Sequence, residues 1–228
     1  PVGLAVALAD KLETLVGMFG IGNLPTGDKD PFALRRHALG VVRMLADKAL
    51  PLNLDALVRD AGLAFGDKIQ DASAALLDFI YERLAGSLRE QGYSAQEVDA
   101  VLALRPQQLG EVSRRLAAVR AFAALPEAPA LAAANKRIAN LLKKAPEVDA
   151  HVSALLLKEP AEIALHSAMG LVLPEAHKQF EAGDYTASLQ TLAALRAPVA
   201  VSPAKPGSVS VTTRSMLIGN STPSVSSS

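Results

Sequence analysis

The sequence has no cysteine and no tryptophan, and aromatic residues make up only 4% of its 228 residues. Without cysteine the fold has no disulfide support, but 50% hydrophobic residues are enough to bury a sizeable core in a chain of this length. Alanine and leucine are abundant, and scarce aromatics with abundant alanine and leucine favour helices over strands. The composition therefore predicts an all-α protein.

Two kinds of segment are also missing. No uninterrupted apolar run reaches the roughly 20 residues that cross a bilayer, and the start lacks the basic region of a signal peptide. We therefore expect a cytoplasmic location, which the lack of cysteine permits. The chain opens at Pro1 without a methionine and enters a helical pattern almost at once, so we expect the natural start to lie upstream and treat the sequence as a fragment.

Neither sign of charge is in excess, because the sequence has 23 basic and 23 acidic residues. A net charge of zero argues against a protein that coats nucleic acid without specificity. Local basic clusters can still bind RNA.

Helical periodicity runs along most of the sequence. Ser94 and Glu97 have the spacing of a capping box, and Gly92 and Gly183 are placed to end helices. From about residue 198 the composition changes to Ser, Val, Thr, Pro and Gly, which predicts a disordered tail over 200–228. The predicted helices span about 2–18, 31–49, 54–63, 66–88, 95–104, a segment from 106, a segment ending at 144, one or two helices within 152–180, and 184–196.

The loop before the second predicted helix is unusually rich in special residues. Within 20–36, three glycines and Pro25 shape the backbone, and Asp30 followed by Pro31 has the pattern of an N-cap and a first helical residue. Arg35 and Arg36 would then lie near a helix N-terminus, which is unfavourable for cations unless Asp28 or Asp30 pairs with them. We therefore favour a structural ion pair over a binding role for these arginines.

A basic stripe is the strongest candidate for a binding site. If 134–144 is helical, its apolar residues face one way and its cations and one amide face the other. Such cations neutralise phosphates, and Arg and Asn can also bond base edges in unpaired RNA. An ordinary solvated helix face explains the pattern equally well at this point. The stripe comprises Lys136, Arg137, Asn140, Lys143 and Lys144, opposite Ile138, Leu141, Leu142 and Ala145.

Catalytic patterns are not evident. The sequence offers no nucleophile beside a base, no phosphate-binding glycine loop and no paired carboxylates, and its four histidines lack metal-ligand spacing. Arg114, Arg115 and Arg120 lie on one predicted helix and can serve RNA or internal ion pairs. This chain by itself is not expected to catalyse a reaction.

Several strings together resemble the β subunit of bacterial tetrameric glycyl-tRNA synthetase. The resemblance covers about residues 1–199, and the strings occur in family order. They are Ala9–Arg36, Asp78–Leu84, Gly92–Ser94, Asp99–Pro106 and Phe180–Pro198.

The resemblance implies an organisation and a function. Residues 1–63 would end an HD-like helical domain and its connecting body, and 64–199 would form an incomplete DALR-type anticodon-binding domain of the kind shared with arginyl-tRNA synthetase. The β subunit would bind tRNA(Gly) within an α2β2 ligase, while the α subunit would hold ATP, Mg²⁺ and glycine; this chain would hold no cofactor. The implied RNA-binding residues are Lys136, Arg137, Asn140, Lys143, Lys144, Arg114 and Arg115.

Two other interpretations remain. Residues 9–12 resemble the last metal-binding segment of HD phosphohydrolases, but the segment that would supply the histidine ligands is missing, and Asp10 alone cannot make a metal site. We therefore expect no metal. The main alternative to RNA binding is a non-catalytic helical scaffold that binds the α subunit without touching RNA.

Overall fold

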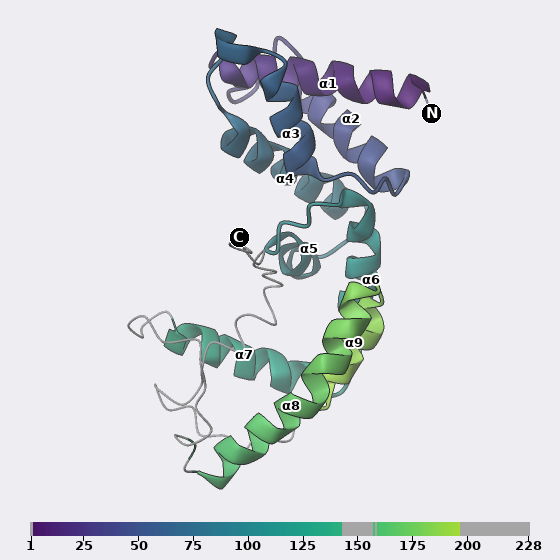
Figure 1. Cartoon of the computed structure of the whole chain (residues 1–228), viewed down its shortest axis with the longest axis vertical. Helices are drawn as coiled ribbons and strands as arrows, with labels where there is room; N and C mark the ends of the chain where they lie inside the picture. The colour runs from purple at the N-terminus through teal and green to yellow at the C-terminus, as the bar shows by residue number, and fades with distance from the viewer. Residues whose placement is uncertain (1, 143–156, 158, 197–228) are drawn as a thin grey trace, which may run out of the picture. The chain divides into compact units, whose positions relative to one another are not determined.

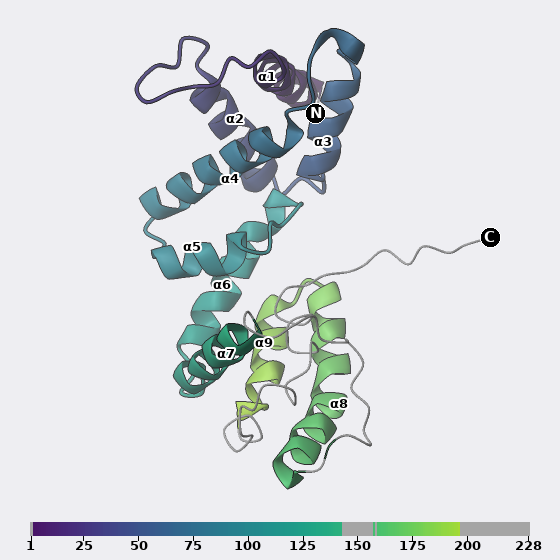
Figure 2. The same ribbon diagram turned by 90° about the vertical axis from the view of Figure 1, so that its left-hand side faces the viewer.

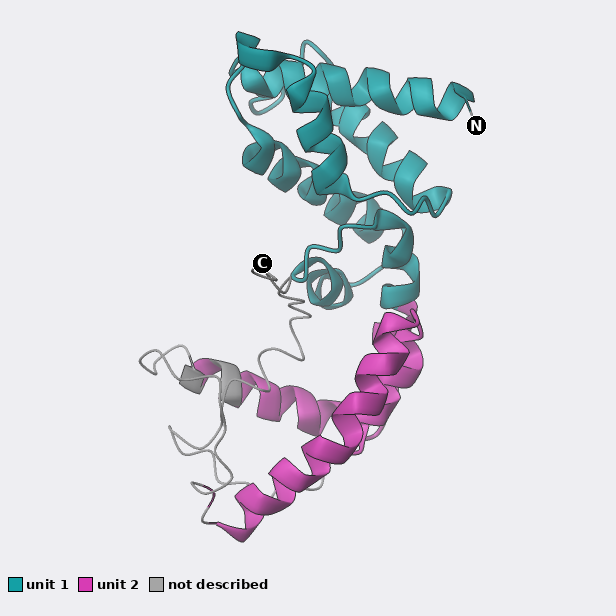
Figure 3. Ribbon diagram, viewed as in Figure 1, with its two compact units in different colours: residues 1–116 teal, residues 117–228 magenta. Residues whose placement is uncertain are grey.

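A computed structural model describes residues 2–142, 157 and 159–196. The chain forms two compact units, Pro1–Leu116 and Ala117–Ser228 (Figure 3). Over the described residues the fold is all-α as predicted: there is no strand, only isolated bridges between Thr26 and Lys29 and between Asn53 and Gln108.

The first unit is a packed group of helices (Figures 1 and 2). Helix α1 packs against α2, α3 and α4, α2 also packs against α4, and α5 packs against α4. The core is aliphatic, with Leu15, Leu45 and Ile80 fully buried. The elements are α1 (Val2–Gly20), α2 (Leu34–Asp47), α3 (Leu54–Leu63), η1 (Gly66–Lys68), α4 (Ser73–Glu90), α5 (Ala95–Leu102), η2 (Leu109–Glu111) and α6 (Val112–Ala123), which continues into the second unit.

The second unit contains α7 (Ala128–Leu142), α8 (Pro160–Glu181) and α9 (Tyr185–Ala193). Helices α8 and α9 pack together across a tight turn at Gly183, whose φ is 77°. Asp184 caps α9 by accepting a bond from the Ala187 amide at 3.0 Å. The Ser188 hydroxyl donates to the Ala176 carbonyl at 2.8 Å and ties the two helices together.

The domain boundary expected near residue 63 lies inside the first compact unit, where α3 packs against α4. That boundary came from the family resemblance and stays a prediction. The predicted tail, 200–228, lies outside the described residues.

Helix α2 begins later than the sequence predicts. The pattern placed Asp30 at the N-cap and Pro31 inside the helix, but the helix starts at Leu34 after Ala33 in the left-handed region, with φ 52°. The Asp30 carboxylate nevertheless caps it, accepting the amides of Leu34 at 2.8 Å and Arg35 at 3.0 Å. An aspartate outside the usual N-cap position can therefore accept hydrogen bonds from the first backbone amides of a helix, which have no partner within the helix.

Helix α4 also begins later than predicted, and its first segment is not α-helical. Gly66–Lys68 is a short 3₁₀ turn, Ile69 is extended, and α4 starts only at Ser73. The Gln70 amide donates to the Gly20 carbonyl at 3.0 Å, and a Cβ at Gly20 would lie 2.7 Å from the Ile69 Cβ. A tertiary contact with the end of α1 thus replaces the local helical pattern.

Two helix-terminus features predicted from the sequence, a capping box and a glycine, are confirmed. Ser94 and Glu97 form the reciprocal capping box before α5. After α4, the amide of Gly92 bonds to the carbonyl of Arg89 and the amide of Tyr93 to that of Leu88, which is the Schellman arrangement. Gly92 has a φ of 89°, where glycine carries no Cβ penalty.

Over the described residues, no single helix has both the length and the apolar composition of a membrane span. The segments Leu109–Ala123 and Ala128–Arg137 reach that length and composition only as a pair joined across a bend.

Gly110 provides a test of the packing in the first unit. A Cβ at this position would lie 2.7 Å from the Ala49 Cα and 2.9 Å from its carbonyl carbon, so backbone would have to move. We expect Gly110→Ala to lower the free energy of unfolding by about 2 kcal/mol. Urea unfolding followed by circular dichroism measures it.

Gly86 is the matched control, because a Cβ there meets nothing within 4 Å and the residue lies inside α4. Gly86→Ala should stabilise the protein by up to about 1 kcal/mol through helix propensity. Equal effects of the two substitutions would contradict the close approach at Gly110.

Candidate nucleic-acid interface

Helix α7 carries the described part of the predicted basic stripe. Lys136, Arg137 and Asn140 are all exposed, as the helical periodicity predicted, and Ala134 is buried on another face of the same helix. The alanine-rich sequence from Ala128 favours this helix. Lys143 and Lys144 lie outside the described residues, as do Ala145 and the side chains of Ile138, Leu141 and Leu142.

The two α7 cations have no ion-pair partner within the part of the chain that the structure describes. Both side chains are exposed to solvent. Asn140 follows Lys136 by four residues, which places the two on the same side of the helix. Two cations and an amide can together hold phosphate oxygens and the edge of an unpaired base.

Arg114 and Arg115 stand in a different environment. Glu111 lies within 3.7 Å of the Arg114 guanidinium and 2.9 Å of the Arg115 guanidinium. The Arg115 side chain is only 17% exposed, whereas that of Arg114 is 60% exposed. Arg115 is thus positioned to hold the start of α6, and of the two predicted binding residues only Arg114 is widely accessible. The Glu111 spacing, three and four residues before the arginines, is the sequence signal for these pairs.

The loop arginines behave differently from the prediction. Arg35 does not pair with Asp28 or Asp30 in the described structure; its guanidinium donates to the Gly27 carbonyl instead. Its own amide donates to Asp30, so side chain and backbone together close the loop. Arg36 is exposed. The structural role expected for Arg35 is present, but a backbone carbonyl takes the place of the carboxylate.

A polar cluster that sequence reasoning missed lies where α4 meets the segment after α5. Arg105 has a φ of 45°, its guanidinium is 2.7 Å from the Asp78 carboxylate, and its Cζ lies 4.9 Å from the centroid of the Tyr81 ring. The Tyr81 hydroxyl donates to the Pro106 carbonyl at 3.2 Å. These contacts join residues 24 to 27 positions apart, so no local pattern indicates them. The cluster fixes the chain that leads into α6.

Burial raises the pKa of Tyr81 to about 12, and the Asp55 carboxylate adds to this effect while Arg105 opposes it. Both main causes disfavour the tyrosinate anion. The ring is largely enclosed, and its hydroxyl serves as a donor within the fold.

Metal-ligating side chains do not gather within the described residues: no group of three or more His, Asp or Glu side chains there could hold an ion. Asp10 is exposed on α1. His177 lies 3.1 Å from Glu181 on the surface of α8, and His151 is outside the described residues.

Comparisons of the sequence with known proteins all lead to the same family. Residues 1–103 match the family described as glycyl-tRNA synthetase beta subunit. The chain is 78% identical over 200 residues to the glycine–tRNA ligase β subunit of Polaromonas naphthalenivorans (strain CJ2), an alignment that covers 87% of this chain. It is 74% identical over 198 residues to the β subunit of Acidovorax sp. (strain JS42), again over 87% of the chain.

The chain belongs to the glycyl-tRNA synthetase β-subunit family. A more divergent relative, the β subunit of Dechloromonas aromatica (strain RCB), is 66% identical over 201 residues and 87% of this chain. In all three cases the alignment covers 28% of the relative, so the chain spans little more than a quarter of the β subunits it matches. The family match covers α1 to α5, while the basic stripe of α7 lies beyond it.

Tyr81 gives a pH-dependent prediction for this family segment. Since the ordinary pKa of a tyrosine is 10.0 and that of Tyr81 in the fold is about 12, the unfolded chain loses its proton first as pH rises. The contribution of Tyr81 to the free energy of unfolding is therefore fully present below pH 10 and is lost as pH rises toward 12. We expect Tyr81→Phe to flatten the fall of the unfolding free energy over that range, and to cost about 1 kcal/mol at neutral pH through the lost bond to Pro106.

Urea unfolding at a series of pH values measures both effects. If the Tyr81→Phe variant lost stability between pH 10 and pH 12 as steeply as the parent chain, another group would be responsible for the dependence.

Proposed function

We propose that this chain is the tRNA-binding, anticodon-side portion of the β subunit of a glycine–tRNA ligase. It would support ATP-dependent glycylation of tRNA(Gly) catalysed by the α subunit. The observation that carries the proposal is the pair of exposed cations Lys136 and Arg137 on α7, in a chain 78% identical to a protein named as a ligase β subunit. These two cations can bind the phosphate groups of RNA.

The charge pattern supports a local RNA contact rather than a general one. Because the net charge of the sequence is zero, attraction to phosphates has to come from clusters. On α7, Lys136 and Arg137 supply point charge and bidentate donors, and Asn140 supplies an amide that can read a base edge. Lys143 and Lys144, one to two turns further along the sequence, would extend the same stripe.

The arginines of α6 would contribute unequally. Arg114 is exposed enough to reach a phosphate, although it would share its charge with Glu111. Arg115 is held close to Glu111 and is largely buried, so its contribution would be to keep α6 in place. If a phosphate displaced Glu111 from Arg115, its binding free energy would have to offset the loss of the Arg115–Glu111 ion pair.

The division of labour in the ligase belongs to the same proposal. ATP, Mg²⁺ and glycine would bind to the α subunit, and the two kinds of subunit would assemble as an α2β2 heterotetramer in the cytoplasm. This chain would contribute helices of the HD-like and DALR-type domains that family resemblance implies, and no catalytic group.

The test compares two charge reversals of equal size in the assembled α and β subunits. Arg137→Glu alters the stripe, and Lys178→Glu alters an exposed lysine on α8. We expect Arg137→Glu to weaken tRNA(Gly) binding about tenfold, equal to about 1.4 kcal/mol, and to reduce the salt dependence of binding. Lys178→Glu should change affinity less than about twofold. Filter binding over a series of salt concentrations measures both.

Unchanged affinity of the Arg137→Glu variant at low salt, with assembly intact, would contradict the assigned surface. If the β segment then bound the α subunit normally while neither the charge reversals on α7 nor Lys143→Glu and Lys144→Glu affected tRNA binding, the scaffold interpretation would replace the RNA-binding one.

A further inference from the structure

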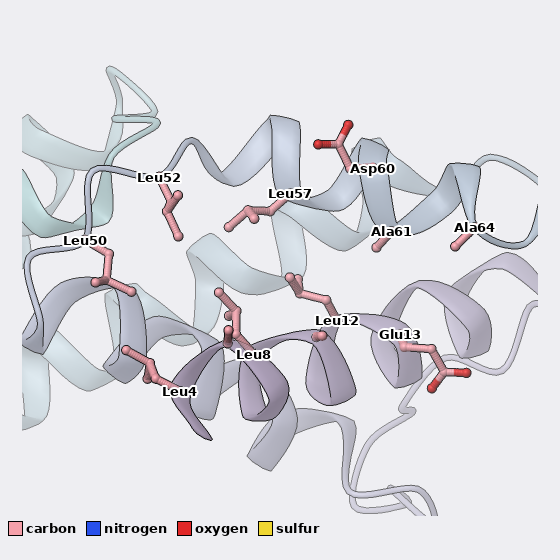
Figure 4. Close-up of a pocket in the computed structure, with 12 residues that line it drawn as sticks. Leu4, Leu8, Leu12, Glu13, Leu50, Leu52, Leu57, Asp60, Ala61 and Ala64 are labelled. Carbon is pink, nitrogen blue, oxygen red and sulfur yellow. The ribbon is translucent and has the colours of Figure 1, made fainter. Parts of the chain in front are cut away.

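An apolar groove opens in the first unit between α1 and α3. Its volume is about 640 Å³, and the segment between α2 and α3 closes one end. Figure 4 shows leucine side chains from α1 pointing toward those of α3 and the preceding segment. The lining residues with the largest apolar side chains are Leu4, Leu8, Leu12, Leu50, Leu52 and Leu57.

Charge is confined to the rim of this groove. Glu13 and Asp60 are the two charged lining residues, and both carboxylates point away from the leucines (Figure 4). Both residues are exposed. An occupant would therefore meet aliphatic surface inside the groove and carboxylates at its edges, of which that of Asp60 also lies 3.8 Å from the Arg59 guanidinium.

The apolar surface continues from the groove onto the outer face of α1. Val2 is 78% exposed and Val6 63% exposed, and they share a helical face with Ala9 and Glu13, two groove residues. Leu52, in the segment that closes one end of the groove, is 37% exposed. Single exposed apolar residues are ordinary, but a continuous patch beside an apolar groove marks an interaction surface.

We propose that this groove and the adjoining α1 face are covered by another part of the same β-subunit polypeptide, in the form of an amphipathic helix. The chain spans only 28% of the β subunits it matches, so most of such a polypeptide lies outside these residues. A groove between two helices accepts a third helix by ordinary ridge-into-groove packing. The covering helix would insert aliphatic side chains between the leucines and place basic residues near Glu13 and Asp60.

Charge argues against a second copy of this chain as the occupant. The exposed α1 face that would enter the neighbouring groove carries Glu13 beside Val2 and Val6, with Asp10 next to it. A symmetric contact would bring these carboxylates toward Glu13 and Asp60 of the other copy, and like charges at close range repel. The proposal rests on family membership and not on tRNA binding, so the two can fail separately.

Thiol labelling tests the proposal, helped by the absence of cysteine from this chain. Ala9 lines the groove and is exposed here, so the thiol of an Ala9→Cys variant should react freely with a maleimide in the isolated chain. In the complete β subunit without α subunit, we expect labelling at that position to slow about tenfold or more. Peptide mapping by mass spectrometry assigns the label to its site.

The matched control is Glu90→Cys, at the exposed end of α4 and outside the groove lining. It should label equally fast in the isolated chain and in the complete β subunit. Equal labelling of Ala9→Cys in both would overturn the proposal. So would protection that appears only when the α subunit is added, or protection in the isolated chain that grows with its concentration.

A second variant keeps the test independent of the new thiol. Val6→Lys places a charge on the exposed α1 face. It should lower the unfolding temperature of the complete β subunit by a few degrees and leave that of the isolated chain within about one degree. The same unfolding temperature in the complete β subunit with and without the substitution would also overturn the proposal.

Discussion

The burial of aliphatic side chains between α1, α2 and α4 is the constraint on which the first unit depends. With 4% aromatic residues and no tryptophan, the core has to be assembled from leucine, isoleucine, valine and alanine. Leu15, Leu45 and Ile80 are fully buried, and each such side chain contributes about 1.5–3 kcal/mol relative to exposure. Small side chains give few contacts per residue, so the helices have to approach closely.

That close approach explains features which look incidental in the sequence. Glycine occurs where neighbouring atoms leave no room for a Cβ, at Gly20 against Ile69 and at Gly110 against Ala49. The groove between α1 and α3 is the exception, because leucines line a hollow there that no described side chain fills, although Leu8 and Leu12 are themselves buried. One physical demand, the covering of aliphatic surface, thus connects the closed core with the proposed docking surface.

Local patterns predicted some elements and missed others for identifiable reasons. Helix α3 has the predicted bounds of Leu54–Leu63, and the Ser94 capping box is present, because both depend on residues near in sequence. The starts of α2 and α4 were wrong, since Asp30 caps from outside its expected position and Gln70 bonds to Gly20 across the fold. The exposure of Lys136 and Arg137 followed from helical spacing, whereas the enclosure of Arg115 depends on its pairing with Glu111 and on tertiary packing.

The proposed function gives the two units different tasks. The aliphatic first unit, which matches the family through residue 103, supplies a framework, while α7 in the second unit presents cations and an amide to solvent. Hydrogen exchange of the assembled α and β subunits with and without tRNA(Gly) tests this assignment most directly. We predict slower exchange of amides in 128–142 on binding, with α1 to α4 unchanged. Exchange in α7 that stays the same while tRNA(Gly) is bound would contradict the assignment.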